Sequence, residues 1–419
     1  MSPVTIFRAR HVFPVTQEAI ADGAVVVADG RILAVGSYAT IRARYPNARL
    51  NDLGDQALFP GAINAHTHLE LTAHAGAVPE GLSFADWIVA LVRVSRRRTP
   101  QDFSEAARLG VRMLLDSGTA AIGEICTHGQ SVEPLVESGL HGVVYYELLG
   151  VDPSLADELL ARGQRQIAIW RERYPGSSLR FGLSLHTPYT VSARLFELAS
   201  AWCRHEGVPL CIHAAESPAE SQWLATGDGP IADTIYAGAG WPRDPDAAPG
   251  CSPVEYLDRL GALEAHPLLV HGVRVDAHDL LTLAEKDIAV AHCPRSNAWL
   301  GCGRLPYGAY RRAGVRLALG TDSLASSPSL SLWDEAAAAY ATHAAAGDDA
   351  QPSELLRHAT LDGAAALGLD AELGSLDVGK LAQLACASLS SLSERDREDE
   401  RSVLAALIDG RLRPGPLRM

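Results

Sequence analysis

Histidine and aspartate residues stand at the ends of several short apolar runs in this chain of 419 residues. Fifteen histidines are present, and six of them occupy such positions, together with one aspartate: His66, His68, His186, His213, His271, His292 and Asp322. Ordinary surface histidines would scatter over helices and loops. Imidazole nitrogens and carboxylate oxygens are ligands that catalytic Zn²⁺ and Fe²⁺ accept. The pattern therefore indicates a metal-assisted reaction.

His66 and His68 are two residues apart, so in an extended segment they face the same side and can reach one ion. An isolated pair of this kind more often makes two separate hydrogen bonds. His213 and Asp322 end other runs and extend the set to three nitrogens and one carboxylate oxygen. We predict that these four residues bind one divalent metal ion, with an open position for water. Zn²⁺ is favoured, and Fe²⁺ is the alternative.

Glu216 follows His213 by three residues and is the candidate general base. Its alternative is a carboxylate at a helix N-terminus, because Ser217 and Pro218 come next. His271 could hold the nucleophile. The alternative is a buried histidine that only forms hydrogen bonds within the protein. We expect His292 to be structural.

Strand-length apolar runs alternate with segments of helical period, and eight such runs can be counted. They span residues 59–65, 119–126, 140–149, 179–186, 208–214, 267–271, 288–292 and 315–321. Continuous apolar runs separated by helices are typical of a parallel sheet. Eight units of this kind predict an α/β fold with a (β/α)8 TIM-type barrel, in which the strand ends carry the functional side chains.

Short β-like runs separated by glycine occur at both ends of the chain, including 403–408 near the C-terminus. We predict a small β-sandwich domain from residues 1–58 and 370–419, around a barrel domain of residues 59–369. Residues 226–252 are rich in Gly, Pro and Asp and are predicted to form a long loop over the barrel mouth. The charged run 393–401 is predicted to be a solvated loop.

The net charge and the cysteine content limit the classes of binding partner and the cellular compartment that we expect. The net charge is −14, which disfavours nucleic acid and anionic membranes and leaves a small-molecule substrate. The seven cysteines include no C-x-x-C pair, which favours reduced thiols. The sequence also shows no apolar leader and no run long enough to span a bilayer, so we expect a cytoplasmic protein. The oligomeric state stays open, and a homo-oligomer is compatible with the sequence.

Five segments together resemble the amidohydrolase superfamily over nearly the whole chain. They are Pro60–His68, His213–Glu216, Val270–Gly272, His292–Asn297 and Gly320–Ser323. The phrases 65–72, 292–297 and 320–332 are similar to the mononuclear branch that deaminates purine-type rings, and most of all to the futalosine-type deaminases of menaquinone biosynthesis.

The resemblance implies hydrolytic release of ammonia from a 6-aminopurine nucleoside derivative. Glu216 would take a proton from the attacking water and pass it to the ring, His271 would hold the nucleophile, and Asp322 would relay a proton to the leaving amine. Two-metal members of the superfamily use a carboxylated lysine at a strand end. The only lysines, Lys286 and Lys380, lie in a helical segment and in the terminal β unit, so a single metal is expected.

Substrate contacts are also implied. His186 matches the position that donates to a purine ring nitrogen. Trp87 belongs to a Ser-Phe-x-x-Trp segment, but Arg96 stands where related deaminases have a ribose-binding Glu. A guanidinium there would suit the benzoate of a futalosine-type substrate. Glu70 and Glu147 are candidate ribose contacts.

Two other classes of function stay open. The same centre could deaminate S-adenosylhomocysteine, methylthioadenosine, guanine or cytosine, or dechlorinate a triazine. The chain could instead be a noncatalytic scaffold with the amidohydrolase fold, which is disfavoured because every predicted ligand and the base are present.

Overall fold

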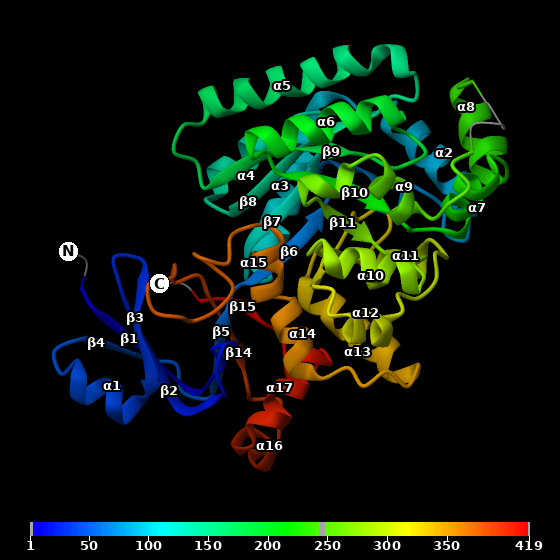
Figure 1. The fold of residues 1–419 in the computed structure, drawn as a ribbon. Helices are drawn as coiled ribbons and strands as arrows, with labels where there is room; N and C mark the ends of the chain where they lie inside the picture. Colours follow the sequence, from blue (N-terminus) through cyan, green and yellow to red (C-terminus); the bar gives the residue numbers. More distant parts are fainter. Residues whose placement is uncertain (1–2, 243–247, 418–419) are drawn as a thin grey trace. The chain divides into compact units, whose positions relative to one another are not determined.

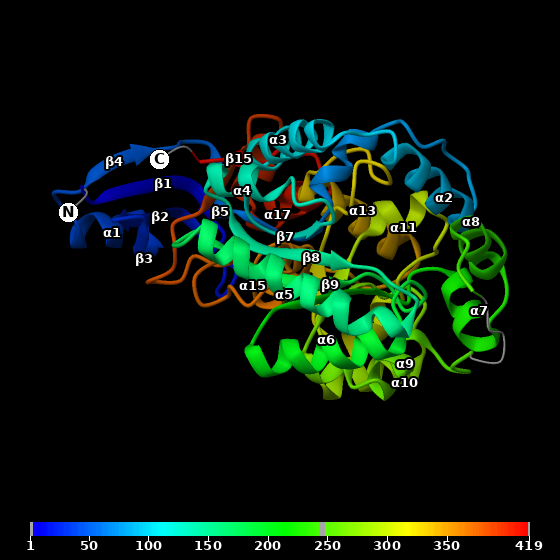
Figure 2. The same ribbon diagram turned by 90° about the horizontal axis from the view of Figure 1, so that it is seen from above.

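The computed structural model describes residues 3–242 and 248–417, and the chain consists of two compact units. The first contains residues 1–64, 113–121 and 331–419, and the second contains 65–112 and 122–330. Figures 1 and 2 label the elements of both. The domain boundaries drawn from the sequence stay a prediction.

Eight parallel strands form a nearly closed barrel, as the apolar runs predicted. Their spatial order follows the chain from β6 to β13. The ring is completed by a bridge between Thr67 and Asp322, and the carbonyl of His66 accepts hydrogen bonds from the backbone N–H groups of Thr321 and Asp322 at 3.0 and 3.1 Å. The strands are β6 (Ala62–Thr67), β7 (Thr119–Cys126), β8 (His141–Leu148), β9 (Leu179–Leu185), β10 (Leu210–Ala214), β11 (Leu268–His271), β12 (Val290–His292) and β13 (Leu317–Leu319).

Helices follow the barrel strands, as the segments of helical period between the apolar runs predicted. Figure 2 shows α5 along β8 and β9, with which it is in contact. The helices of the second unit are η1 (Leu69–His74), α2 (Phe84–Ser95), α3 (Pro100–Asp116), α4 (Val132–Ser138), η2 (Pro153–Leu155), α5 (Ala156–Arg173), α6 (Ala193–Glu206), α7 (Pro218–Thr226), η3 (Ile231–Tyr236), α8 (Ala237–Ala239), α9 (Pro253–Arg259), η5 (Ala262–Ala265), α10 (Ala277–Glu285), α11 (Pro294–Trp299) and α12 (Tyr307–Ala313). The last turn of α3 belongs to the first unit.

The segment 226–252 is not a loop throughout. It contains η3 and α8, while residues 243–247 lie outside the described residues. Ile231, Ile235 and Tyr236 are buried in one apolar cluster with Phe84 and Trp87 of α2. Burial of this apolar stripe explains why a segment rich in glycine and proline still forms helical turns.

Both ends of the chain contribute to one mixed sheet of seven strands, so the predicted pairing of the termini is confirmed. β14 (Leu384–Ser388) runs antiparallel to β5 (Gln56–Pro60), and β15 (Gly415–Pro416) extends this edge. The other strands are β1 (Thr5–Val12), β2 (Ile20–Ala28), β3 (Arg31–Ser37) and β4 (Arg49–Asp52). Phe7, Val25 and Leu384 pack in one buried cluster of this unit.

Two predictions for the C-terminal region are wrong. Residues 403–408 lie in α17 (Glu400–Ile408) rather than in a strand, and most of 393–401 is helical, in α16 (Glu394–Glu398) and the start of α17. The cause is local capping: Ser393 accepts a hydrogen bond from the backbone of Asp396, and Asp399 accepts one from that of Ser402. The remaining helices of the first unit are α1 (Tyr38–Arg44), α13 (Leu332–Ala345), α14 (Pro352–His358) and α15 (Leu361–Ala366).

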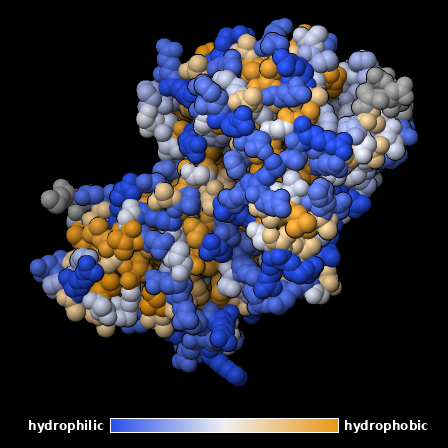
Figure 3. Space-filling model, viewed as in Figure 1, coloured by the Kyte–Doolittle hydropathy of each residue, from blue (hydrophilic) through white to orange (hydrophobic). Residues whose placement is uncertain are grey.

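Hydrophilic side chains cover most of the face of the second unit that is visible in Figure 3, and hydrophobic atoms form scattered spots on it. No helix among the described residues has the length and apolarity needed to cross a membrane.

Candidate metal centre and active site

The structure brings the four predicted metal ligands together at one end of the barrel. His66 lies on β6, His68 directly after it, His213 on β10 and Asp322 just beyond β13. Asp322 Oδ1 is 3.8 Å from His66 Nε2 and 3.6 Å from His68 Nε2. The Nε2 atoms of His68 and His213 are 3.3 Å apart. Residues distant in sequence therefore point their donor atoms at one small volume.

Hydrogen bonds fix the orientation of two of these ligands. His213 Nδ1 donates to the carbonyl of His186 at 2.9 Å, which leaves the Nε2 lone pair directed at the centre. Asp322 Oδ2 accepts from Ser296 Oγ at 2.5 Å and from Ser326 Oγ at 3.2 Å, so Oδ1 is left for the centre.

A metal ion fits these residues. His66 is completely buried, and within the described part of the chain neither of its ring nitrogens has a hydrogen-bond partner. Two buried polar atoms without partners are costly unless something absent from the protein chain binds them. Burial lowers the pKa of both His66 and His213, so both imidazoles are neutral at pH 7 and can donate lone pairs.

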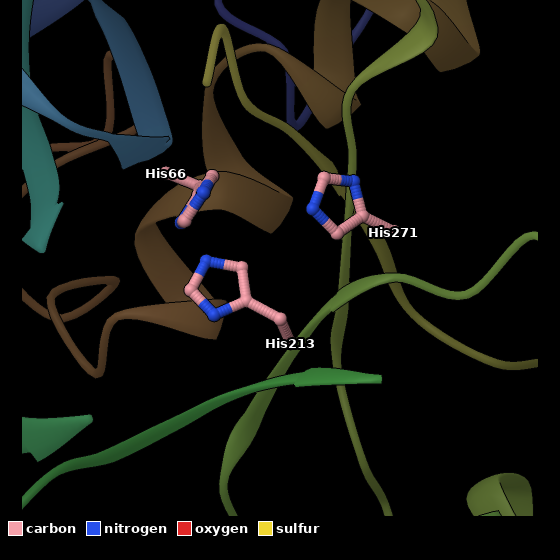
Figure 4. Close-up of side chains that lie close together, drawn as sticks. All are labelled: His66, His213 and His271. Atoms are coloured by element: carbon pink, nitrogen blue, oxygen red, sulfur yellow. The ribbon is translucent and has the colours of Figure 1, made fainter. Parts of the chain in front are cut away.

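His271 ends β11, and its ring faces those of His66 and His213 (Figure 4). Its Nδ1 donates to Asn297 Oδ1 at 3.0 Å, and its Nε2 is 3.5 Å from Glu216 Oε1. Burial lowers the pKa of His271 to about 4. The ring is therefore a neutral group held in one orientation beside the carboxyl group of Glu216.

Glu216 lies just after β10 and is 7% exposed. Burial, and then the nearby carboxylate of Asp322, raise its pKa well above the usual value. The thiol of Cys302 lies 3.9 Å from Oε1. A carboxylate whose pKa is raised binds a proton more strongly than an ordinary one, and perturbed pKa values of this kind are common at catalytic sites.

Three residues of this region have left-handed backbone conformations although none is glycine. They are Ala215, with φ of 55°, His271, with φ of 77°, and Asp322, with φ of 56°. Such conformations cost free energy and persist where the surrounding structure enforces them, often at functional sites. Here they turn the chain sharply where three strands end.

A cavity of about 360 Å³ opens beside the cluster. His186, Trp87, Arg96 and Glu147 line it, as does Glu216, so four of the five predicted substrate contacts reach its wall. The side of α2 that faces the cavity is apolar, while Arg96 is exposed at the C-terminal cap of this helix.

Two residues that line the cavity, Trp87 and Glu147, each have a buried polar atom without a partner. Within the described residues, the buried Oε1 atom of Glu147 and the indole Nε1 of Trp87 have no hydrogen-bond partner, whereas Glu147 Oε2 accepts from Thr127 Oγ1 at 2.7 Å. His186 Nδ1 pairs with Thr190 Oγ1 at 2.8 Å. Both Glu147 and Trp87 thus have a buried polar atom that no other described residue pairs with.

Glu70 is the predicted contact that does not line the cavity. Its carboxylate accepts hydrogen bonds from the backbone N–H groups of Thr127, His128 and Gln130, at 3.1, 2.8 and 2.6 Å. These bonds favour a role in holding the loop after β7. Its assignment as a substrate contact stays a prediction.

His74 anchors the end of α2 through a bond of 2.9 Å between its Nε2 and Ser95 Oγ, and burial lowers its pKa to about 4. In the unfolded chain the pKa of a histidine is near 6.5, so as the pH falls His74 binds a proton in the unfolded chain at a higher pH than in the folded protein. We therefore expect His74 to reduce stability by about 2 kcal/mol between pH 7 and pH 5. Urea unfolding at both pH values should show this loss in the wild type and a correspondingly smaller one in His74→Gln. An equal loss in both would contradict the assignment.

Several supporting residues were not found from sequence: Thr67, Glu124, Thr190, Glu220, Ser296, Asn297 and Cys302. Glu124 had a signal, since it is an acid inside an otherwise apolar run. Glu220 accepts from the N–H groups of Ala215 and Glu216 at 3.2 and 2.7 Å, four residues along the chain. Thr190 likewise lies four residues from its partner His186. Thr67, Ser296, Asn297 and Cys302 have partners in distant elements, which spacing does not reveal.

Residues 57–412 match the Amidohydrolase family, and the chain belongs to this family. It is a hydrolase that acts on C–N bonds, and its relatives identify it as a hydrolytic deaminase.

Three similar proteins illustrate this. An aminodeoxyfutalosine deaminase from Deinococcus radiodurans is 38% identical over 323 residues, which cover 75% of this chain and 74% of the relative. The structure of Helicobacter pylori aminofutalosine deaminase in complex with methylthio-coformycin has a TM-score of 0.83 at 25% identity and covers 96% of each chain. A zinc-bound adenosine deaminase from Xanthomonas campestris has a TM-score of 0.79 at 28% identity, covering 97% of this chain and 89% of the other.

Proposed function

We propose that this protein is a metal-dependent deaminase that converts 6-aminodeoxyfutalosine to its 6-oxo product and ammonia, in menaquinone biosynthesis. The observation that carries the proposal is the convergence of His66, His68, His213 and Asp322 next to Glu216, at the wall of a cavity. The similarity to aminodeoxyfutalosine deaminases supports the substrate.

His66, His68, His213 and Asp322 would hold one metal ion, for which we propose Zn²⁺ because a similar deaminase structure contains bound zinc. The ion supplies Lewis acidity that makes water a better nucleophile. The preference for zinc over iron rests on this similarity alone, because imidazole and carboxylate ligands bind both metals.

Glu216 would take a proton from the attacking water and return it to the ring nitrogen next to C6. The water oxygen bonds to C6, and the bond between C6 and the exocyclic amine breaks. Asp322 would relay the second proton of the water to this amine, which leaves as ammonia. His271, neutral and held by Asn297, would position the water. His186 lines the cavity and would orient the ring, while Trp87 and Glu147, which also line it, would contact the remainder of the substrate.

Arg96 at the cavity rim would bind the benzoate carboxylate. Because charged hydrogen bonds contribute about 1.5–3 kcal/mol, we expect Arg96→Ala to lower kcat/KM for aminodeoxyfutalosine by about 10- to 100-fold. Activity on adenosine, which lacks the carboxylate, should change little. The matched control is Arg93→Ala, since Arg93 is exposed on the same helix but does not line the cavity. An equal loss on both substrates would contradict this role.

The noncatalytic scaffold stays the alternative from another class. Purified protein that holds about one zinc or iron per chain supports the deaminase. Protein that never binds metal, even after supplementation, would favour the scaffold.

A further inference from the structure

Glu124 lies in the middle of β7 and is completely buried. Within the described residues it forms no ion pair, and the charge of a neighbouring acid, Glu70, acts on it. A buried carboxyl group without a cation is expensive unless hydrogen bonds replace water. Its contacts therefore indicate what the group does in this position.

The carboxyl group of Glu124 contacts the segment that carries His66 and His68. Thr67 Oγ1 donates to Oε2 at 2.6 Å, and the backbone N–H of Leu69 lies 3.1 Å from Oε1 and 3.0 Å from Oε2. The two contacts flank His68 on both sides, and the first lies between the two histidines.

The direction of these side chains follows from strand geometry. Successive residues of an extended segment point to opposite sides, so Thr67 points away from the side on which His66 and His68 meet. The hydroxyl of Thr67 also lies 3.3 Å from the carbonyl of Gly123, next to Glu124 on the same strand. Residues 67 and 69 thus form hydrogen bonds to Glu124 of β7 on the side of the segment opposite the imidazoles, while the two imidazoles point into the site.

We propose that Glu124 is a positioning residue that holds the His66-Thr67-His68 segment in the geometry that binds the metal ion. The proposal rests on the metal site of the proposed function. Outer hydrogen-bond partners of metal ligands typically change metal affinity by about 10- to 100-fold when they are removed. A carboxyl group that only stabilised the barrel would change unfolding without changing the release of metal.

Asp279 provides a matched control. It is 2% exposed and, in the capping box of α10, accepts hydrogen bonds from the backbone of Asp276 at 3.1 Å and from Ser252 Oγ. Asp279→Asn therefore alters a buried acid of the second unit that contacts neither His66, Thr67 nor His68.

The test measures zinc release into a chromogenic chelator from the zinc-loaded, full-length protein. We expect Glu124→Gln to release zinc about 10- to 100-fold faster than the wild type, with a smaller increase for Thr67→Val. The double variant should release zinc little faster than Glu124→Gln, because the two groups act as a unit. Asp279→Asn should release it at the wild-type rate. In cobalt-substituted protein, the visible absorption band should shift in Glu124→Gln but not in Asp279→Asn.

Wild-type release rates in both Glu124→Gln and Thr67→Val, with lowered unfolding temperatures, would overturn the proposal and leave Glu124 as a structural group. If Glu124→Gln does not fold, Thr67→Val decides, because it removes the hydroxyl at nearly constant shape. A wild-type protein that binds no zinc would instead refute the metal site itself.

Discussion

Glu216→Gln is expected to lower kcat for deamination by about 10²- to 10⁴-fold while the metal stays bound, because an amide cannot take a proton from water. Gln has nearly the same shape and can still contact the thiol of Cys302, so the surroundings should change little. Stopped assays of ammonia release, with metal analysis of the same samples, measure both quantities.

Full activity in Glu216→Gln would remove this residue from the role of base. Loss of metal together with activity would show that Glu216 acts on the metal site and not on the proton. We expect neither of these outcomes, because burial raises the pKa of Glu216 and so makes its carboxylate a better proton acceptor than an ordinary one.

His213→Gln is expected to abolish both metal binding and activity. His213 Nε2 is directed at the centre by the bond from Nδ1 to the carbonyl of His186, and it lies 3.3 Å from His68 Nε2. Loss of a ligand should weaken zinc binding by more than the roughly 10- to 100-fold typical of outer-shell changes. Metal content after dialysis and competition with a chelator measure the effect.

His292→Gln is the matched control for this experiment. His292 also ends a barrel strand and is buried, but it does not line the cavity. It should keep its zinc and most of its activity. Equal loss of metal from both variants, or retention by both, would contradict the assignment of His213 as a ligand.

The barrel could be predicted from sequence because its strands are buried and therefore appear as continuous apolar runs. Once the strands are placed, their ends must converge, so His66, His213 and Asp322 could be grouped although they span more than 250 residues. His66 and His68 could be placed on the same side because side chains of an extended segment alternate between its two sides.

The errors and omissions have physical reasons. Residues 403–408 are apolar enough for a strand, but the cap at Asp399 and the surrounding packing favour a helix. Asn297, which orients His271, is 26 residues away from it, and Glu124 is 57 residues away from Thr67. Such pairs form only when the barrel brings neighbouring strands together. Glu70 is a further example. The sequence does not reveal that its carboxylate accepts hydrogen bonds from the loop after β7.

The most direct test of the central claim follows ammonia release from aminodeoxyfutalosine, adenosine, S-adenosylhomocysteine and guanine with the zinc-loaded wild-type protein. We predict one ammonia per turnover and the highest kcat/KM for aminodeoxyfutalosine. Preference for any of the other three substrates would contradict the proposed substrate, and absence of ammonia from all four, with zinc bound, would contradict the proposed deaminase.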